Sequence, residues 1–149
     1  MSDRAIGRFS KAFPEFVFAD ITACLRAGQW TGAVILGCCA IDYMSRYYSG
    51  DPGHSMNRTK YIKFLQRFFG PRYDADEFYK FVRSGLVHGY NTARRYIVTG
   101  SSARWARELH MRHDGRHRAT IVNAHALYSD IRAAFKSYVE TLKVDEDAA

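Results

Sequence analysis

The feature that most constrains the fold is a long apolar run in the first third of the chain. From residue 34 to residue 48 the sequence is almost continuously apolar, and its only charged residues are Asp42 and Arg46. A helix that is apolar all round is buried on several sides, so this run predicts the central helix of a helical protein. Asp42 and Arg46 stand four residues apart, and an ion pair between them on this helix is one explanation for their presence.

Apolar residues recur at helical spacing in several other segments. The predicted helices cover residues 14–28, 57–69, 74–89 and 123–142. Pro14 suits the first turn of one helix, and Asn123 suits the cap of the last one. Glycine inside a helix costs ~1 kcal/mol relative to alanine, so interior glycines indicate close packing. These glycines are Gly32, Gly37 and Gly85. Residues 1–13 are expected to be a loosely held lead-in, and residues 144–149 an acidic, frayed tail.

The periodicity changes after residue 91. Residues 95–99 and 119–122 are rich in β-forming residues, and apolar and polar residues alternate over 108–113. Asp114 and Gly115 form a strong hairpin signal, so we expect a small antiparallel element of two or three strands. The chain is thus predicted to be one mainly all-α domain over residues 1–149. Its expected architecture is an up-and-down bundle of about five helices with a small β-hairpin before the last helix.

Composition and charge limit the classes of function. The chain has 149 residues, of which 47% are hydrophobic and 15% aromatic, which favours a packed domain over disorder. Its formal net charge of +7 favours a polyanionic partner, although a solvated basic surface would give the same charge. No run reaches the ~18 apolar residues of a membrane span, and no signal-peptide pattern is present. Cys24, Cys38 and Cys39 are expected to be core thiols, and the expected location is the cytoplasm.

The helix predicted over 74–89 ends in a dense set of polar residues. Among them, Arg83 and His88 could bind a phosphate and move a proton. In an ideal helix, residues five apart differ by ~140° in direction and by ~7.5 Å along the axis. The pair therefore suits a helix terminus, and Gly89 is expected to supply a left-handed cap there. The alternative is a histidine whose cation is stabilised by the helix C-terminus, with Arg83 at the surface.

Five neighbouring residues are candidates for binding the same substrate. Ser84, Tyr90 and Asn91 can each hydrogen-bond a phosphate or a base, and each could equally cap or close the turn. Arg94 and Arg95 would extend the positive surface, or would belong to an ordinary exposed loop. The sequence contains no phosphate-cradling glycine loop, no GxSxG and no HExxH.

Three histidines, His110, His113 and His117, are the candidates for metal ligands. On a strand over 108–113, His110 and His113 would point to opposite faces, and no cysteine lies nearby. We therefore expect exposed basic hairpin residues, with no metal site and no other cofactor.

An arginine and a histidine with four residues between them resemble the R-x4-6-H motif of the HEPN superfamily. Ser84 matches the polar residue that usually follows this arginine, and residues 30–43 look like the family's long early helix. The resemblance covers most of the chain. It implies a homodimeric, metal-independent endoribonuclease of the toxin–antitoxin or defence kind, with Arg83 and His88 as catalytic residues. It also implies attack by a ribose 2′-hydroxyl, a cyclic phosphate product, and two copies of the pair near one two-fold axis.

Two other functions fit the same residues. The domain could bind RNA or a nucleotide without cutting it, or could partner a separate nucleotidyltransferase, whereas a separate antitoxin would be the partner of a toxin. It could instead be a structural helical protein whose aromatic faces mediate assembly. In that case, changes at Arg83 and His88 would alter stability alone.

Overall fold

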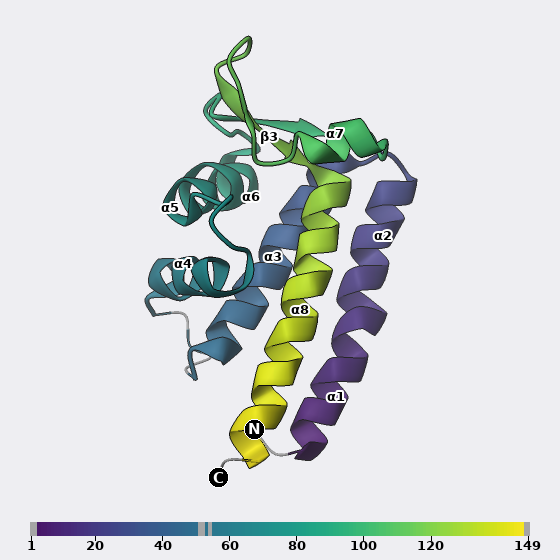
Figure 1. Cartoon of the computed structure of the whole chain (residues 1–149), viewed down its shortest axis with the longest axis vertical. Coiled ribbons are helices and arrows are strands. Elements are labelled where there is room, and N and C mark those ends of the chain that lie inside the picture. The colour runs from purple at the N-terminus through teal and green to yellow at the C-terminus, as the bar shows by residue number, and fades with distance from the viewer. Residues whose placement is uncertain (1–2, 51–52, 54, 148–149) are drawn as a thin grey trace.

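The computed structural model describes residues 3–50, 53 and 55–147, and most of these residues are helical. Figure 1 shows long helical rods that lie side by side. The first rod consists of α1 (Asp3–Phe13), η1 (Pro14–Phe18) and α2 (Ala19–Arg26), and the other two are α3 (Trp30–Tyr48) and α8 (Ala124–Asp147). A mainly helical bundle, as predicted from the sequence, is therefore confirmed.

Shorter helices pack against α3 on the side away from α1 and α2 (Figure 1). They are α4 (Asn57–Phe68) and a composite helix of α5 (Ala75–Glu77), η2 (Phe78–Ser84) and α6 (Gly85–Gly89). The central position predicted for residues 34–48 is confirmed, because Val34, Cys38 and Ile41 of α3 are fully buried. The expected close packing is confirmed at Gly37, where a Cβ atom would lie 2.8 Å from Ile131 Cδ1 of α8.

A small sheet lies at one end of the rods, just before α8 (Figure 1). Its strands are β1 (Tyr96–Thr99), β2 (His113–Asp114) and β3 (Ala119–Asn123), in the order β1-β3-β2. The predicted hairpin is confirmed, since β2 and β3 pair antiparallel with Asp114 opposite Ala119. The expectation that the whole element is antiparallel is wrong, because β1 and β3 are parallel. The connecting segment, which includes α7 (Arg104–Glu108), carries the chain back so that both strands run in one direction.

The segment at the N-terminus differs from the prediction. Residues from Asp3 onward form a helix rather than a loose lead-in, because Ile6, Phe9 and Phe13 lie at helical spacing and pack into the core. The ring centroids of Phe13 and Phe135 of α8, for example, are 4.9 Å apart. Pro14 therefore lies within a continuous helix and not at its start. The wider π-helical turns of η1 begin at this proline, which cannot donate a backbone hydrogen bond.

The two ends of α8 also differ in how well the sequence predicts them. Asn123 caps the helix as predicted, because its Oδ1 accepts a hydrogen bond from the Ala126 backbone nitrogen at 3.0 Å. The expected frayed tail is wrong for residues 144–147, which continue α8, whereas residues 148–149 lie outside the described residues.

The cysteines are all free thiols: Cys38 is buried as expected, Cys24 is half-buried and Cys39 is exposed. In the part of the chain that the structure describes, no helix has the length and apolar character needed to cross a membrane.

Candidate functional site

Arg83 and His88 lie near the end of one helix that changes width along its length. The helix begins after Asp74, whose carboxylate accepts a hydrogen bond from the Glu77 backbone nitrogen at 3.0 Å and so caps the first turn. The segment η2 then forms wider π-helical turns, with hydrogen bonds from residue i to residue i+5. Arg83 belongs to this wide segment, and His88 belongs to the α-helical turn of α6 that follows it.

The two side chains meet at the end of this helix. Arg83 Nη1 lies 3.4 Å from His88 Nε2, although residues five apart in a regular α-helix point ~140° away from each other. The residues between the pair, from Gly85 onward, are α-helical, so it is the long arginine side chain that reaches along the helix end to the histidine. The imidazole is exposed, whereas only 15% of the Arg83 side chain is exposed. The pair is therefore held at the surface, at a helix terminus.

A third residue, Asp42 of α3, fixes the arginine. Its Oδ2 accepts hydrogen bonds from Arg83 Nε at 2.8 Å and from Arg83 Nη2 at 2.6 Å. The guanidinium also lies over the Tyr79 ring, 5.3 Å from its centroid. The sequence pattern offered Arg46 as one partner for Asp42, and the contact with Arg83 was not predicted. The available signal was a carboxylate within an otherwise apolar helix, which requires a cationic partner somewhere in the fold.

The contacts define the chemical state of the pair. A guanidinium can only donate hydrogen bonds, so this contact is a hydrogen bond in the tautomer whose Nε2 accepts and whose proton is on Nδ1. Burial lowers the pKa of Arg83, but the hydrogen bond and charge of Asp42 outweigh burial and leave this pKa above its usual value. The site therefore offers a proton acceptor at the surface beside a permanently charged donor.

The helix ends one residue later than predicted. Gly89 is still helical, and Tyr90 supplies the left-handed cap with a φ of 52°. The chain then folds back, and the Asn91 backbone nitrogen donates to the Gly85 carbonyl oxygen at 3.1 Å. A Cβ atom at position 85 would collide with the Asn91 carbonyl oxygen. The close packing predicted at Gly85 is therefore confirmed, and it is what allows the loop to return onto α6.

The backbone of this loop is strained beyond the cap. Ala93 and Arg94 have φ values of 53° and 60°, in the left-handed region that non-glycine residues rarely occupy. The Asn91 side chain supports this conformation, since its Oδ1 accepts a hydrogen bond from the Ala93 nitrogen at 2.7 Å. Strained residues of this kind cost roughly 1–3 kcal/mol each and are concentrated at functional sites. Of the two roles left open for Asn91, closing the loop is the one this contact performs.

A cavity of about 490 Å³ lies beside the loop. Tyr90, Asn91 and Arg94 contribute to its lining, together with His117 from the turn between β2 and β3. The structure therefore brings three of the predicted substrate-binding residues together and adds a histidine that no pattern in the sequence places there. The paired arginine and histidine do not line this cavity. Its volume falls within the range of roughly 300–1,000 Å³ that is usual for small-molecule sites.

The remaining two candidates lie apart from this cavity. Ser84 is half-buried at the end of η2, next to Arg83 in the chain. Arg95 forms an ion pair with Glu77 and lies over the Phe81 ring, 5.2 Å from its centroid. Its charge is therefore partly compensated, unlike that of the exposed Arg94.

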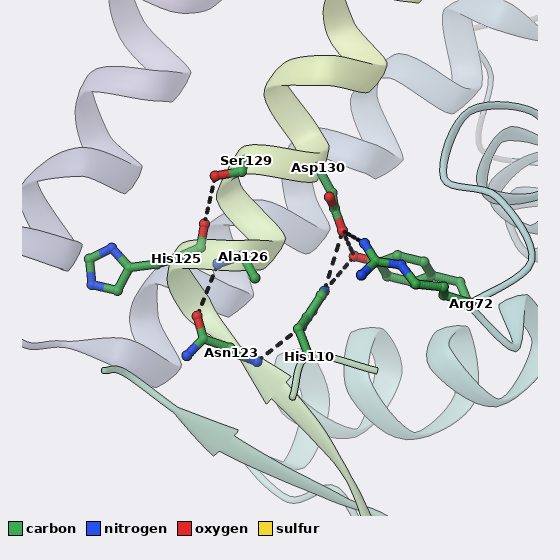
Figure 2. A network of polar contacts seen from close by, with 8 residues as sticks. Arg72, His110, Asn123, His125, Ala126, Ser129 and Asp130 are labelled. Atoms are coloured by element: carbon green, nitrogen blue, oxygen red, sulfur yellow. Dashed lines mark hydrogen bonds and ion pairs between the residues drawn. The ribbon is translucent and has the colours of Figure 1, made fainter. Parts of the chain in front are cut away.

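A separate cluster of polar residues is buried where the sheet meets α8 (Figure 2). His110 Nδ1 accepts a hydrogen bond from the Asn123 backbone nitrogen at 3.0 Å, so its proton lies on Nε2, which is 2.7 Å from the Tyr73 hydroxyl. Tyr73 in turn donates to Asp130 Oδ2 at 2.7 Å. The expectation that His110 is an exposed hairpin residue is wrong. Its partners lie 13 and 37 positions away in the chain, so no local pattern reveals them.

Asp130 completes the cluster. Arg72 Nη2 lies 3.0 Å from its Oδ2, and His110 Nε2 lies 3.5 Å from the same oxygen. Burial raises the pKa of Asp130, but hydrogen bonds from His110 and Tyr73, together with the charge of Arg72, outweigh burial and place this pKa below its usual value. The cluster therefore ties the sheet to α8.

The other two histidines of this region are exposed, as expected. His113 lies on β2, and His117 Nδ1 is 2.7 Å from Asp114 Oδ2, an interaction that lowers the pKa of Asp114. Among the residues described in the structure, no three or more His, Cys, Asp or Glu side chains are grouped so that they could hold a metal ion.

Comparison with known proteins adds no relative to this picture: no family model, no curated protein and no solved structure matches the chain.

Proposed function

We propose that the protein is a HEPN-like, metal-independent endoribonuclease in which Arg83 and His88 carry the chemistry. The observation that supports this most directly is the 3.4 Å approach of Arg83 Nη1 to His88 Nε2 at the end of a helix. In a regular α-helix the same spacing would separate the two side chains. The formal net charge of +7 further supports a substrate that carries phosphates.

In the proposed reaction, His88 Nε2 takes the proton of a ribose 2′-hydroxyl. The 2′-oxygen forms a bond to the adjacent phosphorus, and the bond from phosphorus to the 5′-oxygen of the next nucleotide breaks. That oxygen takes up a proton from the imidazolium or from water. The products are a 2′,3′-cyclic phosphate and a 5′-hydroxyl. Arg83 Nη1 donates to a non-bridging phosphate oxygen and stabilises the charge that develops on it.

In this proposal Asp42 is a positioning residue. By accepting from Nε and Nη2, it directs the remaining nitrogen of the guanidinium, Nη1, toward His88. A phosphate that reaches Nη1 therefore also reaches the imidazole. This fixed orientation lowers the entropy lost when the substrate is aligned for attack.

The proposed active form is a homodimer with the two pairs close to its two-fold axis, where their charges combine into one positive cleft. Its biological role would be that of a toxin or defence enzyme. An antitoxin or a separate nucleotidyltransferase would be its regulating partner.

The direct test is cleavage of a mixed RNA pool by the purified protein in the presence of EDTA. We expect 2′,3′-cyclic phosphate ends, and we expect His88→Ala to lower the rate by roughly 10²–10⁴-fold, the usual contribution of a general base. His113→Ala is the matched control, because His113 is also an exposed histidine. Intact RNA at high protein concentration, with no difference between the wild type and His88→Ala, would exclude the catalytic proposal.

A second candidate function is binding of RNA or a nucleotide without cleavage. Two observations favour it: Asp42 already compensates the charge of Arg83, and the cavity beside the loop holds Tyr90, Asn91 and Arg94 but not the pair. This function predicts that Arg94→Ala weakens a salt-dependent RNA affinity while no product forms with any variant. Arg104→Ala is its control, because Arg104 is also exposed but lies outside this cavity.

A further inference from the structure

A second cavity lies away from the paired arginine and histidine. It has a volume of about 680 Å³ and is formed by α1 and η1 on one side and by Tyr43, Tyr47 and Tyr138 of α3 and α8 on the other. The two elements that frame it, α1 and α8, lie side by side in Figure 1. This volume is within the range of roughly 300–1,000 Å³ that holds small organic ligands.

Its walls are mainly aromatic. Phe9 and Tyr43 face each other with nearly parallel rings whose centroids are 6.0 Å apart, and the Tyr43 and Tyr47 rings are 4.8 Å apart. Phe16 is 65% exposed, a high value for a phenylalanine that contributes to a cavity wall. Such surfaces gain free energy, about 25 cal/mol per Å², when an apolar group covers them.

The charged groups of this cavity are all positive. Arg4 and Arg8 stand one helical turn apart on α1, and both are exposed. Within the described part of the chain, neither arginine pairs with a carboxylate, and no acidic side chain contributes to the lining. Two guanidinium groups at this spacing can bind one carboxylate or phosphate together.

One polar group at the cavity has no partner in the described part of the protein. Tyr138 is 1% exposed, it contributes to the lining, and its hydroxyl makes no hydrogen bond. Burial raises the pKa of Tyr138 to about 12, so the hydroxyl keeps its proton and remains a donor at neutral pH. A buried hydroxyl without a partner is unfavourable.

We propose that this cavity is a binding site for an amphipathic anion, a molecule with an apolar body and one carboxylate or phosphate group. The apolar body lies against Phe9, Phe16 and Tyr43, and the acid group binds Arg4 and Arg8. The site is independent of Arg83 and His88, so it stands whether or not the protein cleaves RNA.

The test uses the fluorescent aromatic anion 8-anilinonaphthalene-1-sulfonate as a probe. We expect saturable binding of one probe per chain, and displacement of the probe by 1-naphthyl phosphate or by dodecanoate. The stronger of these two competitors tells whether an aromatic or an aliphatic body is preferred. The double variant Arg4→Gln/Arg8→Gln should bind all three anions at least about tenfold more weakly. It should retain its affinity for uncharged 1-naphthalenemethanol.

Two further variants test whether binding takes place in this cavity. Ala12→Trp fills the cavity from α1 and should abolish binding of both the charged and the uncharged molecules, whereas Arg26→Gln, an exposed change outside the cavity, should alter neither. The proposal is overturned if the arginine variant binds the anions as tightly as the wild type, or if Ala12→Trp leaves binding intact. It is also overturned if sedimentation shows a dimer that Ala12→Trp dissociates, because a second copy would then cover this surface.

Discussion

Asp42 decides how much of the Arg83 charge remains available to a ligand. The carboxylate holds two of the three guanidinium nitrogens, and 13% of its side chain is exposed. Little water therefore screens this interaction, and removing the charge of Asp42 affects the position of the arginine as well as the local potential.

Asp42→Asn should lower the free energy of unfolding by roughly 1–3 kcal/mol, because a half-buried arginine loses its counter-charge. In the proposed enzyme, RNA should bind a few-fold more tightly, since no carboxylate repels it, while cleavage slows because Nη1 is no longer directed at His88. Urea unfolding and single-turnover cleavage measure the two effects. Faster cleavage by Asp42→Asn would contradict the positioning role.

A substitution at Gly85 tests how much the packing of the loop against α6 contributes to stability. Alanine normally stabilises a helix by ~1 kcal/mol relative to glycine, but a Cβ atom here meets the Asn91 carbonyl oxygen. Gly85→Ala should therefore destabilise the protein, by roughly 1–3 kcal/mol in urea unfolding. The matched control is Gly7→Ala in α1, where a Cβ atom meets nothing within 4 Å, and this change should stabilise the protein. Equal effects of the two substitutions would show that the contact at Gly85 has no energetic weight.

At the scale of helices and strands, sequence patterns predicted best what is decided locally. The helices α3, α4 and α8, the capping role of Asn123 and the turn at Asp114 follow from periodicity and from residues next to one another in the chain. The direction of β1 relative to β3 is not decided locally, because the sequence of an apolar strand does not indicate which strand it pairs with. Apolar and polar residues alternate over 108–113 as in a strand, but Glu108 is the last residue of α7. His110 is buried in this segment because it contacts Tyr73, which is distant in the chain.

In the candidate site, too, the sequence predicted the local features and not the contacts between distant residues. The motif identified Arg83 and His88, but helical periodicity does not show that the arginine side chain reaches along the helix end to the histidine. The position of Asp42 could not be predicted either. It lies 41 residues earlier, and its partner is chosen by the packing of α3 against η2.

The buried cluster that links the sheet to α8 should make stability depend on pH. The pKa of Asp130 is lowered in the folded protein, so this carboxylate stabilises the fold at pH values above its unfolded pKa, near 4. The stabilisation is lost as the pH falls through the folded pKa. Asp130→Asn should therefore cost roughly 1–3 kcal/mol at pH 7 and progressively less in acid, as measured by urea unfolding across this range.

The control for this measurement is Asp76→Asn. Asp76 and Arg58 form an ion pair in which both side chains are more than half exposed, so its removal should change stability little. A difference between wild type and Asp130→Asn that stays constant from pH 7 to acid would contradict the assigned role of this carboxylate.

At the scale of the whole molecule, the proposed dimer can be separated from the chemistry of one chain. Arg83 and His88 contact each other within a single chain, so each subunit of a dimer carries a complete pair. Mixing inactive Arg83→Ala and His88→Ala proteins should therefore not restore RNA cleavage, although sedimentation velocity should show dimers. Restored activity would mean that one subunit supplies the arginine and the other the histidine.

Asn123 connects the sheet, the loop at Ser101 and the start of α8. Its backbone nitrogen reaches His110, its amide nitrogen donates to the Ser101 carbonyl oxygen at 2.9 Å, and its Oδ1 caps α8. Since the residue is fully buried, its backbone proton can exchange with deuterated solvent only after the sheet separates from the last helix. The hydrogen-exchange rate of this one proton, measured by NMR in the intact protein, therefore reports how often the sheet separates from α8.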